Sequence, residues 1–237
     1  MSDIFDLNRF STSSKIKAGK LALIEEFKSS LYKTAKHLCG YTDMTWHTHG
    51  AMCEALQEST KRKLIVMPRG TFKSSIAVVA YSVWLLINNP NLRILIDSEK
   101  YENSKNFIGE IKGKLENDKI TKLFGSFRSD NKWAEGAITI QQRSLVLKEA
   151  SVTASGMGAG KTGQHYDVII CDDLNTEENS ESPDQRKKIL RHYRMNTSIL
   201  EPDGIMVVIG TRYATDDVVG HIINNEIGEQ NEPSRSV

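Results

Sequence analysis

The sequence has 237 residues, of which 31 are Lys or Arg and 30 are Asp or Glu, so that the formal net charge is +1. This balance excludes a chain that wraps nucleic acid along its whole surface, and any contact with nucleic acid is therefore expected to be local. Three cysteines without metal-ligand spacing, and the lack of an apolar run near 18 residues, predict a reduced, intracellular protein with no membrane contact.

The first part of the chain is predicted to be helical. Apolar residues recur at helical spacing over residues 15–40, where Gly40 ends the pattern, and a second helix is expected over residues 48–61. We assign residues 1–45 to an N-terminal helical extension and residues 46–225 to the domain that carries the function.

An apolar strand at residues 64–67 runs into a turn with the features of a phosphate-binding loop. In such a loop backbone N–H groups wrap the phosphates, a Lys neutralises them, and a Ser coordinates Mg²⁺ at the start of the following helix. Here that helix is predicted over residues 74–88. The residues predicted to bind phosphate are Pro68, Arg69, Gly70, Thr71, Phe72, Lys73, Ser74 and Ser75, and Ser74 is also the predicted metal ligand.

The loop departs from the consensus G-x-x-x-x-G-K-[ST] at both glycines. Met67 stands in place of the first glycine and Phe72 in place of the second. Taken alone, the segment leaves two interpretations open, a phosphate site or a surface lysine at a helix start. Arg69 is similarly either a phosphate or sensor residue or a solvated loop cation.

Strands and helices alternate through the middle of the chain. A strand at 93–97 and a helix at 103–115 fit a βαβ unit, residues 138–140 and 144–147 are predicted to form a hairpin, and a short strand follows at 152–153. The segment 155–163 contains Gly-Lys-Thr, but a strand and not a helix follows it. It is either a tight connection with positive φ angles or a loop that carries a positive charge toward nucleotide.

The apolar run 166–171 ends in two acids, Asp172 and Asp173. Such a run is typical of a buried parallel strand, and ligands of an open α/β sheet bind beyond the carboxyl ends of its strands. We therefore expect Asp172 and Ser74 to meet on one Mg²⁺, with Asp173 facing the attacking water. The order of the two motifs favours a nucleotide hydrolase.

The last part of the chain is expected to complete an α/β fold. A polar loop at 175–183 and a helix at 184–200 precede a strand at 205–209, and residues 226–237 are predicted to be a flexible tail. The predicted fold class is a P-loop NTPase of the RecA/ASCE type, with a mainly parallel central sheet flanked by helices and a helical N-terminal extension.

These motifs, in their order, resemble the ATPase half of the large terminase subunit of tailed bacteriophages. The resemblance covers Thr45 to Ile223. It rests on Pro68-Arg69-Gly70-x-x-Lys73-Ser74, Trp133, the segment Gly156 to Gly163, His165 with the two acids, Glu178-Asn179, Arg186, and Gly210-Thr211-Arg212-Tyr213.

The resemblance implies a motor that uses ATP and Mg²⁺ to translocate double-stranded DNA into a procapsid in the host cell cytoplasm. It also implies a homo-oligomeric ring on the portal protein, with the small terminase subunit as a further partner. A net charge near zero and no evident apolar patch lead us to expect an isolated chain that is monomeric or weakly associating. The C-terminal nuclease that family members usually carry is not expected in this chain.

The resemblance further implies roles for individual residues. Asp173 takes the place of the usual catalytic Glu, and Glu177 or Glu178 are the alternatives. Lys161 and His165 are the candidates for a finger that stabilises transition-state charge, often across a subunit boundary. The full set of catalytic candidates is Lys73, Arg69, Asp173, Glu178, Lys161 and His165, and Gly210, Thr211 and Arg212 correspond to the coupling motif.

Two other functions stay open. A helicase-like DNA translocase shares both nucleotide motifs but needs a second RecA-like domain. A scaffold that binds nucleotide without hydrolysis is suggested by Phe72 and by the missing Glu.

Overall fold

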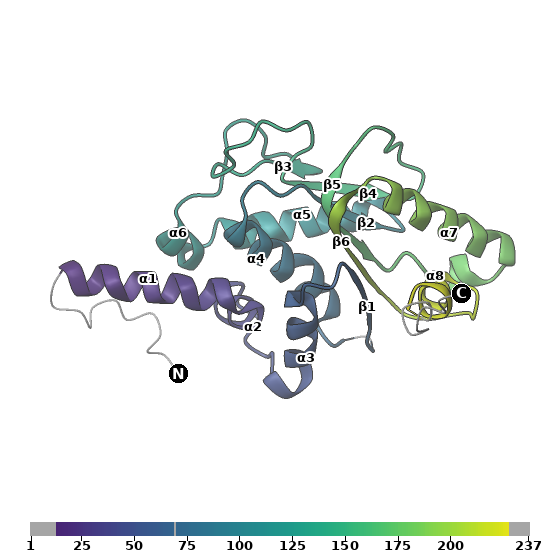
Figure 1. The fold of residues 1–237 in the computed structure, drawn as a ribbon, viewed down its shortest axis with the longest axis horizontal. Helices are drawn as coiled ribbons and strands as arrows, with labels where there is room; N and C mark the ends of the chain where they lie inside the picture. Colours follow the sequence, from purple (N-terminus) through teal and green to yellow (C-terminus); the bar gives the residue numbers. More distant parts are fainter. Residues whose placement is uncertain (1–12, 69, 228–237) are drawn as a thin grey trace, which may run out of the picture.

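A six-stranded sheet forms the centre of the computed structural model, which describes residues 13–68 and 70–227 (Figure 1). The strand order is β1-β6-β5-β2-β4-β3, and all neighbouring strands are parallel except β3 and β4. The mainly parallel sheet with helices on both faces confirms the expected fold class. The strands are β1 (Arg62–Val66), β2 (Ile94–Ser98), β3 (Ala137–Ile138), β4 (Val152–Gly156), β5 (Tyr166–Asp172) and β6 (Leu200–Gly210).

Most of the expected helices are present, with boundaries that shift by a few residues. The helix after the phosphate-binding loop is continuous through η4 and α4, and α6 is a helix that the sequence analysis did not predict. The helical segments are α1 (Ser13–Ser29), α2 (Leu31–Lys33), η3 (Thr34–Leu38), α3 (Trp46–Gln57), η4 (Ser75–Ala80), α4 (Tyr81–Asn88), α5 (Tyr101–Leu115), α6 (Asp118–Phe124), η5 (Glu178–Ser180), α7 (Pro183–Ser198), α8 (Val218–His221) and η6 (Ile222–Ile227).

Alternate side chains of the strands enter two separate apolar cores. Ile96 and Ile170 pack with Ile76 of the helix that follows the phosphate-binding loop. Leu95 and Ile169, one residue earlier on the same two strands, pack on the other face with α7. Because the side chains of successive strand residues point to opposite faces, two adjacent residues at the end of β5 also point to opposite faces of the sheet.

The N-terminal extension packs against the helix that carries the phosphate-binding loop. Instead of the single predicted helix, the chain breaks at Ser30, where the N–H of Leu31 donates to Oε1 of Gln57 at 2.8 Å. Phe27 belongs to the same apolar core as the sheet, and Gly40 ends the helical region with a φ of 80°. The division into an extension and a domain at residue 45 stays a prediction.

The predicted hairpin at 138–140 and 144–147 is wrong. β3 is only two residues long and pairs with β4, and residues 144–147 form no strand. The N–H groups of Ser144 and Leu145 both donate to Oδ1 of Asn91 at 3.0 Å, so a side chain takes the donors that a strand partner would need. Val146 at the tip of this loop is fully exposed.

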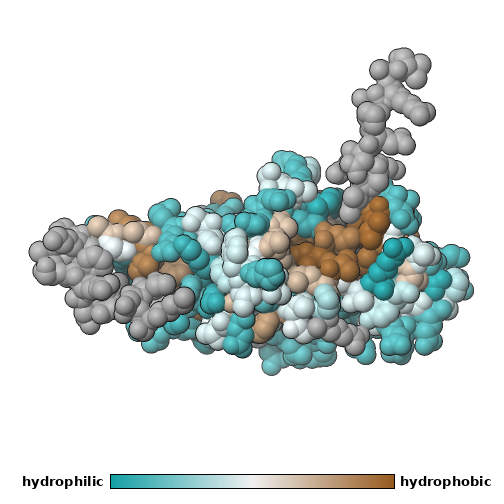
Figure 2. All heavy atoms as spheres, turned by 90° about the horizontal axis from the view of Figure 1, so that it is seen from below, coloured by the Kyte–Doolittle hydropathy of each residue, from teal (hydrophilic) through white to brown (hydrophobic). Residues whose placement is uncertain are grey.

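The strand β1 lies at one edge of the sheet and is partly apolar at the surface. Figure 2 shows an apolar patch at the position along the long axis where Figure 1 places β1, and Val66 at the end of this strand is 49% exposed.

No helix within residues 13–68 or 70–227 is long and apolar enough to cross a bilayer. Of the predicted flexible tail, residues 226–227 are helical in η6, and the rest lies outside the described residues.

The glycines of the segment 155–163 provide a matched test of the backbone. A Cβ on Gly156 would lie 2.5 Å from the backbone N of Tyr101, whereas a Cβ on Gly160 would meet nothing within 4 Å. Gly156→Ala should therefore push α5 away from β4 and lower the unfolding free energy by about 1–3 kcal/mol, as overpacked sites do. Gly160→Ala is the control, expected within about 0.5 kcal/mol of the wild type, and urea denaturation measures both. Equal stabilities of the two variants would contradict this packing.

Candidate functional site

The phosphate-binding loop adopts left-handed backbone conformation at two residues. Gly70 has a φ of 80° and Phe72 a φ of 56°, and the helix starts directly afterwards, with the N–H of Ile76 donating to the carbonyl of Phe72 at 2.9 Å. Glycine adopts such angles without strain, which explains why the consensus has glycine in place of Phe72. The departure from the motif thus changes the residue but keeps the left-handed backbone. Arg69 lies outside the described residues.

Lys73 joins the three predicted motifs at one edge of the sheet. Its Nζ lies 3.3 Å from Oδ1 of Asp173 and 3.4 Å from Oγ1 of Thr211, residues that are 100 and 138 positions away in the sequence. The side chain of Lys73 is 9% exposed. Asp173 and Thr211 follow parallel strands that end at this edge, which is where an open α/β sheet binds its ligands.

Ser74 and Asp172 meet as the sequence analysis predicted. The hydroxyl of Ser74 donates to Oδ1 of Asp172 at 2.7 Å. Burial raises the pKa of Asp172 to about 6. The hydrogen bond from Ser74 lowers this pKa, and the negative charge of Asp173 raises it further. A hydroxyl and a carboxylate are the hard oxygen ligands that Mg²⁺ prefers, and Mg²⁺ commonly takes one or two protein ligands beside water and phosphate. These two residues therefore fit a Mg²⁺ ion.

Asp173 is held in an unusual turn that faces the same site. Its φ is 43°, its N–H donates to the carbonyl of Ile209 at 2.9 Å, and its side chain is 48% exposed. The carboxylate is thus fixed at the mouth of the site beside Lys73. Glu177 and Glu178, the alternatives for the catalytic acid, are both exposed at the start of η5.

One acidic residue at this edge was missed by the sequence analysis. Ser98, the last residue of β2, is aligned with Asp172 of β5, so that Glu99 follows at the level of Asp173. The sequence shows that Glu99 follows a strand but not that this strand lies next to β5, so the strand pairing is needed to find it.

Lys161 is a buried ion-pair partner and not an exposed finger. It is 2% exposed, and its Nζ donates to Oδ1 of Asp97 at 2.7 Å and to Oδ1 of Asn196 at 2.8 Å. Nε2 of His192 and Nδ2 of Asn196 each lie 2.6 Å from Oδ2 of Asp97. Asp97 points to the face of the sheet covered by α7, opposite to the face of Asp172. The structure therefore places Lys161 on the face of the sheet opposite to Asp172, where it is buried.

The partners of Asp97 outweigh the cost of its burial. Burial alone would raise the pKa of this carboxyl, but the hydrogen bond from His192 and the charge of Lys161 lower the pKa to about 2. The carboxylate is therefore ionised and fully compensated inside the protein.

His165 is also remote from the site of its own chain. It is exposed and directly precedes β5, whereas Asp172 ends that strand. Seven residues at about 3.3 Å each separate the two by roughly 20 Å. His165 can reach a nucleotide only in a neighbouring molecule.

Of the residues that correspond to the coupling motif, Thr211 contacts the site and Arg212 does not. Gly210 ends β6 opposite Val66 of β1, and Thr211 reaches Lys73, but Arg212 is exposed and donates from Nε to the carbonyl of Ala214 at 3.3 Å. The described part of the chain thus combines a strand, a left-handed loop, a helix and two acids on a parallel strand. This is the P-loop NTPase fold.

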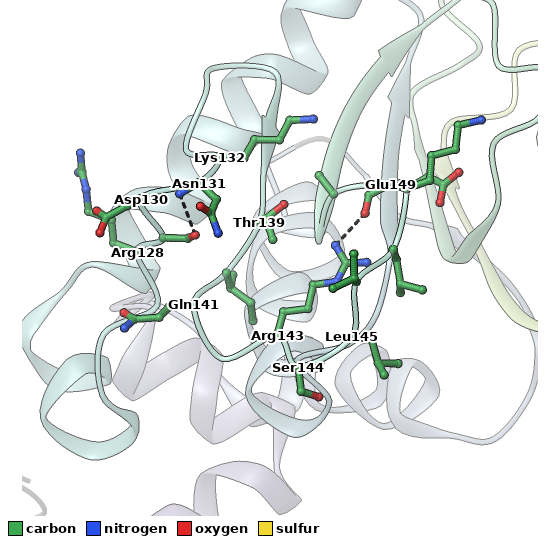
Figure 3. A pocket seen from close by; sticks show the side chains of 16 residues that line it. Arg128, Asp130, Asn131, Lys132, Thr139, Gln141, Arg143, Ser144, Leu145 and Glu149 are labelled. Atoms are coloured by element: carbon green, nitrogen blue, oxygen red, sulfur yellow. Dashed lines mark hydrogen bonds between the residues drawn. The ribbon is translucent and has the colours of Figure 1, made fainter.

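A hollow lies away from this edge. Its volume is about 520 Å³, and Figure 3 shows Arg143 reaching across it to the carbonyl of Glu149, to which Nη1 donates at 2.7 Å. The hollow lies beside the residues that lead into β4, and none of the described residues of the phosphate-binding loop lines it. It is therefore not part of the nucleotide site.

Comparisons with known proteins give a likeness of fold at low identity. No family model matches the sequence, and no curated protein matches it. The large terminase ATPase domain of Thermus phage P74-26 is 18% identical, with a TM-score of 0.42, over 76% of this chain and 68% of that one. A point mutant of that domain gives 18% identity and a TM-score of 0.44 over 76% and 69% of the two chains.

Dbp5 of S. cerevisiae, bound to Nup159, Gle1, IP6 and ADP, is similar to this chain to a comparable degree. It is 15% identical, with a TM-score of 0.46, over 80% of this chain and 47% of that one. The chain therefore spans about half the length of the Dbp5 chain.

The buried position of Lys161 leads to a stability prediction. Lys161→Met removes the cation and leaves Asp97 buried with a charge that is only partly compensated, which should lower the unfolding free energy by about 3–5 kcal/mol. Lys148→Met is the control, because Lys148 is exposed and its Nζ donates to the carbonyl of Gly163 at 2.8 Å. Urea denaturation should separate the two variants clearly. An unchanged stability of Lys161→Met would show that the amino group does not reside in the cluster.

Proposed function

We propose that this chain is the Mg²⁺-dependent ATPase motor domain of a viral DNA-packaging terminase, which translocates double-stranded DNA into a procapsid. The convergence of Lys73, Ser74, Asp172 and Asp173 at one edge of the sheet supports the ATPase part of this proposal. The packaging part is supported by the order of the motifs, including Gly210-Thr211-Arg212 at the end of β6.

The residues of the site divide the chemistry among them. Ser74 and Asp172 would hold Mg²⁺, which would neutralise the negative charge that develops on the phosphate oxygens. When ATP binds, the ammonium group of Lys73 leaves Asp173 and binds the β- and γ-phosphates, because the phosphate oxygens carry more negative charge than one carboxylate. This exchange frees the carboxylate of Asp173 to orient a water molecule.

The water oxygen forms a bond to the γ-phosphorus while the bond from this phosphorus to the β,γ-bridging oxygen breaks. The bridging oxygen leaves on ADP with the electron pair, and the proton of the water passes to Asp173 and then to the released phosphate. Thr211 is in contact with Lys73 and so senses its movement during the exchange.

The partners in this proposal are double-stranded DNA, the portal protein and the small terminase subunit. The motor acts as a homo-oligomeric ring on the portal, whereas the isolated chain is monomeric or weakly associating. Because Lys161 is buried, His165 is the better of the two finger candidates: it is exposed at the far end of β5, where a neighbouring subunit can approach it.

The lysine of the loop gives the first test. Lys73→Ala should reduce steady-state ATP hydrolysis by at least about 10²-fold, because positioning and electrostatic stabilisation supply nearly all catalysis of phosphoryl transfer. Lys122→Ala, on the exposed face of α6, is the control. Hydrolysis is measured with and without double-stranded DNA, and wild-type turnover in Lys73→Ala would refute the assignment of the loop.

The same measurement separates the alternatives. Stimulation of hydrolysis by double-stranded DNA supports a packaging motor, whereas stimulation by single-stranded nucleic acid alone favours the helicase-like translocase. Binding of Mg·ATP without turnover under any of these conditions favours the scaffold.

The two acids should separate binding from catalysis. Asp172→Asn should weaken Mg²⁺-dependent ATP binding by about tenfold or more, because it removes a charged metal ligand. Asp173→Asn should leave binding nearly intact and reduce the rate by about 10²–10⁴-fold. Calorimetry for binding and a phosphate-release assay for turnover measure the two effects. If Asp173→Asn keeps its rate, the variants Glu177→Gln, Glu178→Gln and Glu99→Gln identify which other acid orients the water.

A further inference from the structure

Phe72 adopts a backbone conformation that a phenylalanine normally avoids. Its φ of 56° lies in the left-handed region, where a side chain beyond glycine is strained. Such a conformation persists only where the surroundings hold it in place. The residue directly precedes Lys73 and the first turn of the helix, so the direction of the phosphate-binding N–H groups depends on it.

Two buried rings hold the side chain of Phe72. The ring of His49 meets it edge-on, with centroids 5.8 Å apart and an interplanar angle of 81°, and the ring of Tyr41 lies 6.1 Å away at 51°. His49 and Tyr41 are 5% and 9% exposed, so both are part of the packed interior. We call Tyr41, His49 and Phe72 the aromatic clamp.

The two holding rings are themselves fixed by elements outside the loop. Nδ1 of His49 lies 3.1 Å from the N of Thr45, the residue that caps the N-terminus of α3. The hydroxyl of Tyr41 donates to Oε1 of Glu110 on α5 at 2.6 Å. The position of Phe72 is therefore tied to two helices through the aromatic clamp, and both helices also pack against η4, which begins at Ser75.

We propose that His49 and Tyr41 are positioning residues for phosphate binding. A glycine adopts the left-handed φ without strain because it has no side chain, whereas Phe72 is kept at this φ by the packing of the aromatic clamp. Without the clamp, the backbone at Phe72 relaxes toward ordinary φ values and turns the N–H groups of the loop away from the phosphates. This inference rests on the proposed function, since it requires that the loop binds a nucleoside triphosphate.

A rescue experiment tests the coupling between His49 and the backbone. The dissociation constant of Mg·ATP is measured by calorimetry for the wild type, His49→Ala, Phe72→Gly and the double variant. His49→Ala should raise the constant about tenfold in the wild-type background, since left-handed strain of the usual size has an effect of that order. In the Phe72→Gly background the same substitution should change the constant by less than about twofold, because glycine needs no clamp.

A histidine on the same helix provides the matched control. His47 is exposed two residues before His49, and His47→Ala should not change the constant. If His49→Ala weakens binding by the same factor in both backgrounds, or if His47→Ala matches it, the clamp is refuted.

An inorganic ligand distinguishes positioning of the loop from a contact with the base. The loss in His49→Ala should be equal for Mg·ATP and for Mg·tripolyphosphate, because the clamp acts on the phosphate-binding backbone. A loss confined to Mg·ATP would assign His49 to the base and overturn the proposal.

A measurement without nucleotide separates this inference from the proposed function. Phe72→Ala and Phe72→Gly both remove the ring, but only alanine keeps a Cβ at the left-handed position, so the melting temperature of Phe72→Ala should be the lower of the two. Equal melting temperatures would refute the strained backbone. If the wild type binds neither Mg·ATP nor Mg·tripolyphosphate, the proposed function and the positioning role fail together, whereas additive losses in a wild type that binds both refute the clamp alone.

Discussion

The constraint that organises this protein is the cost of burying a carboxylate at the edge where the parallel strands end. Asp97 and Asp172 lie near the ends of neighbouring strands and point to opposite faces of the sheet. Asp97 is compensated within the chain, and its pKa falls to about 2. Among the described residues Asp172 accepts a hydrogen bond from the hydroxyl of Ser74, and burial still raises its pKa to about 6. The first carboxylate is thus structural, and in the proposed function Mg²⁺ would compensate the second.

The parts of the site that the sequence predicted well are those with a local cause. The hydrophobic periodicity and the turn residues around Lys73 predict a strand, a turn and a helix in succession. The paired acids follow an apolar run of strand length. Parallel topology then requires these ends to meet, which is how Ser74 reaches Asp172. The left-handed angle at Phe72 was not predicted, because the sequence analysis treated this residue only as a departure from the consensus glycine.

The errors arose where side-chain partners far away in the sequence decide the outcome. Lys161 looked like a loop cation because Asp97 and Asn196 are distant in the sequence, and only the fold shows that they enclose it. Residues 144–147 include three successive apolar residues, as a strand can, but the side chain of Asn91 takes the backbone donors of Ser144 and Leu145. The short helix α6 was missed, although Asn117 caps it through a hydrogen bond to the N–H of Ile120 at 3.0 Å. Glu99 became visible only with the pairing of β2 and β5.

The position of β1 has a consequence for how the protein is made. Among the described strands β1 pairs only with β6. During synthesis β1, which leads into the phosphate-binding loop, therefore cannot form its hydrogen bonds to the sheet until β6 has been made. Lys73 and Thr211 are 138 residues apart, which a ribosome takes several seconds or more to synthesise at roughly 5–20 residues per second. During that interval an apolar strand edge has no partner and is open to aggregation. The nascent chain therefore depends on the early packing of its N-terminal helices, or on a chaperone, until β6 emerges.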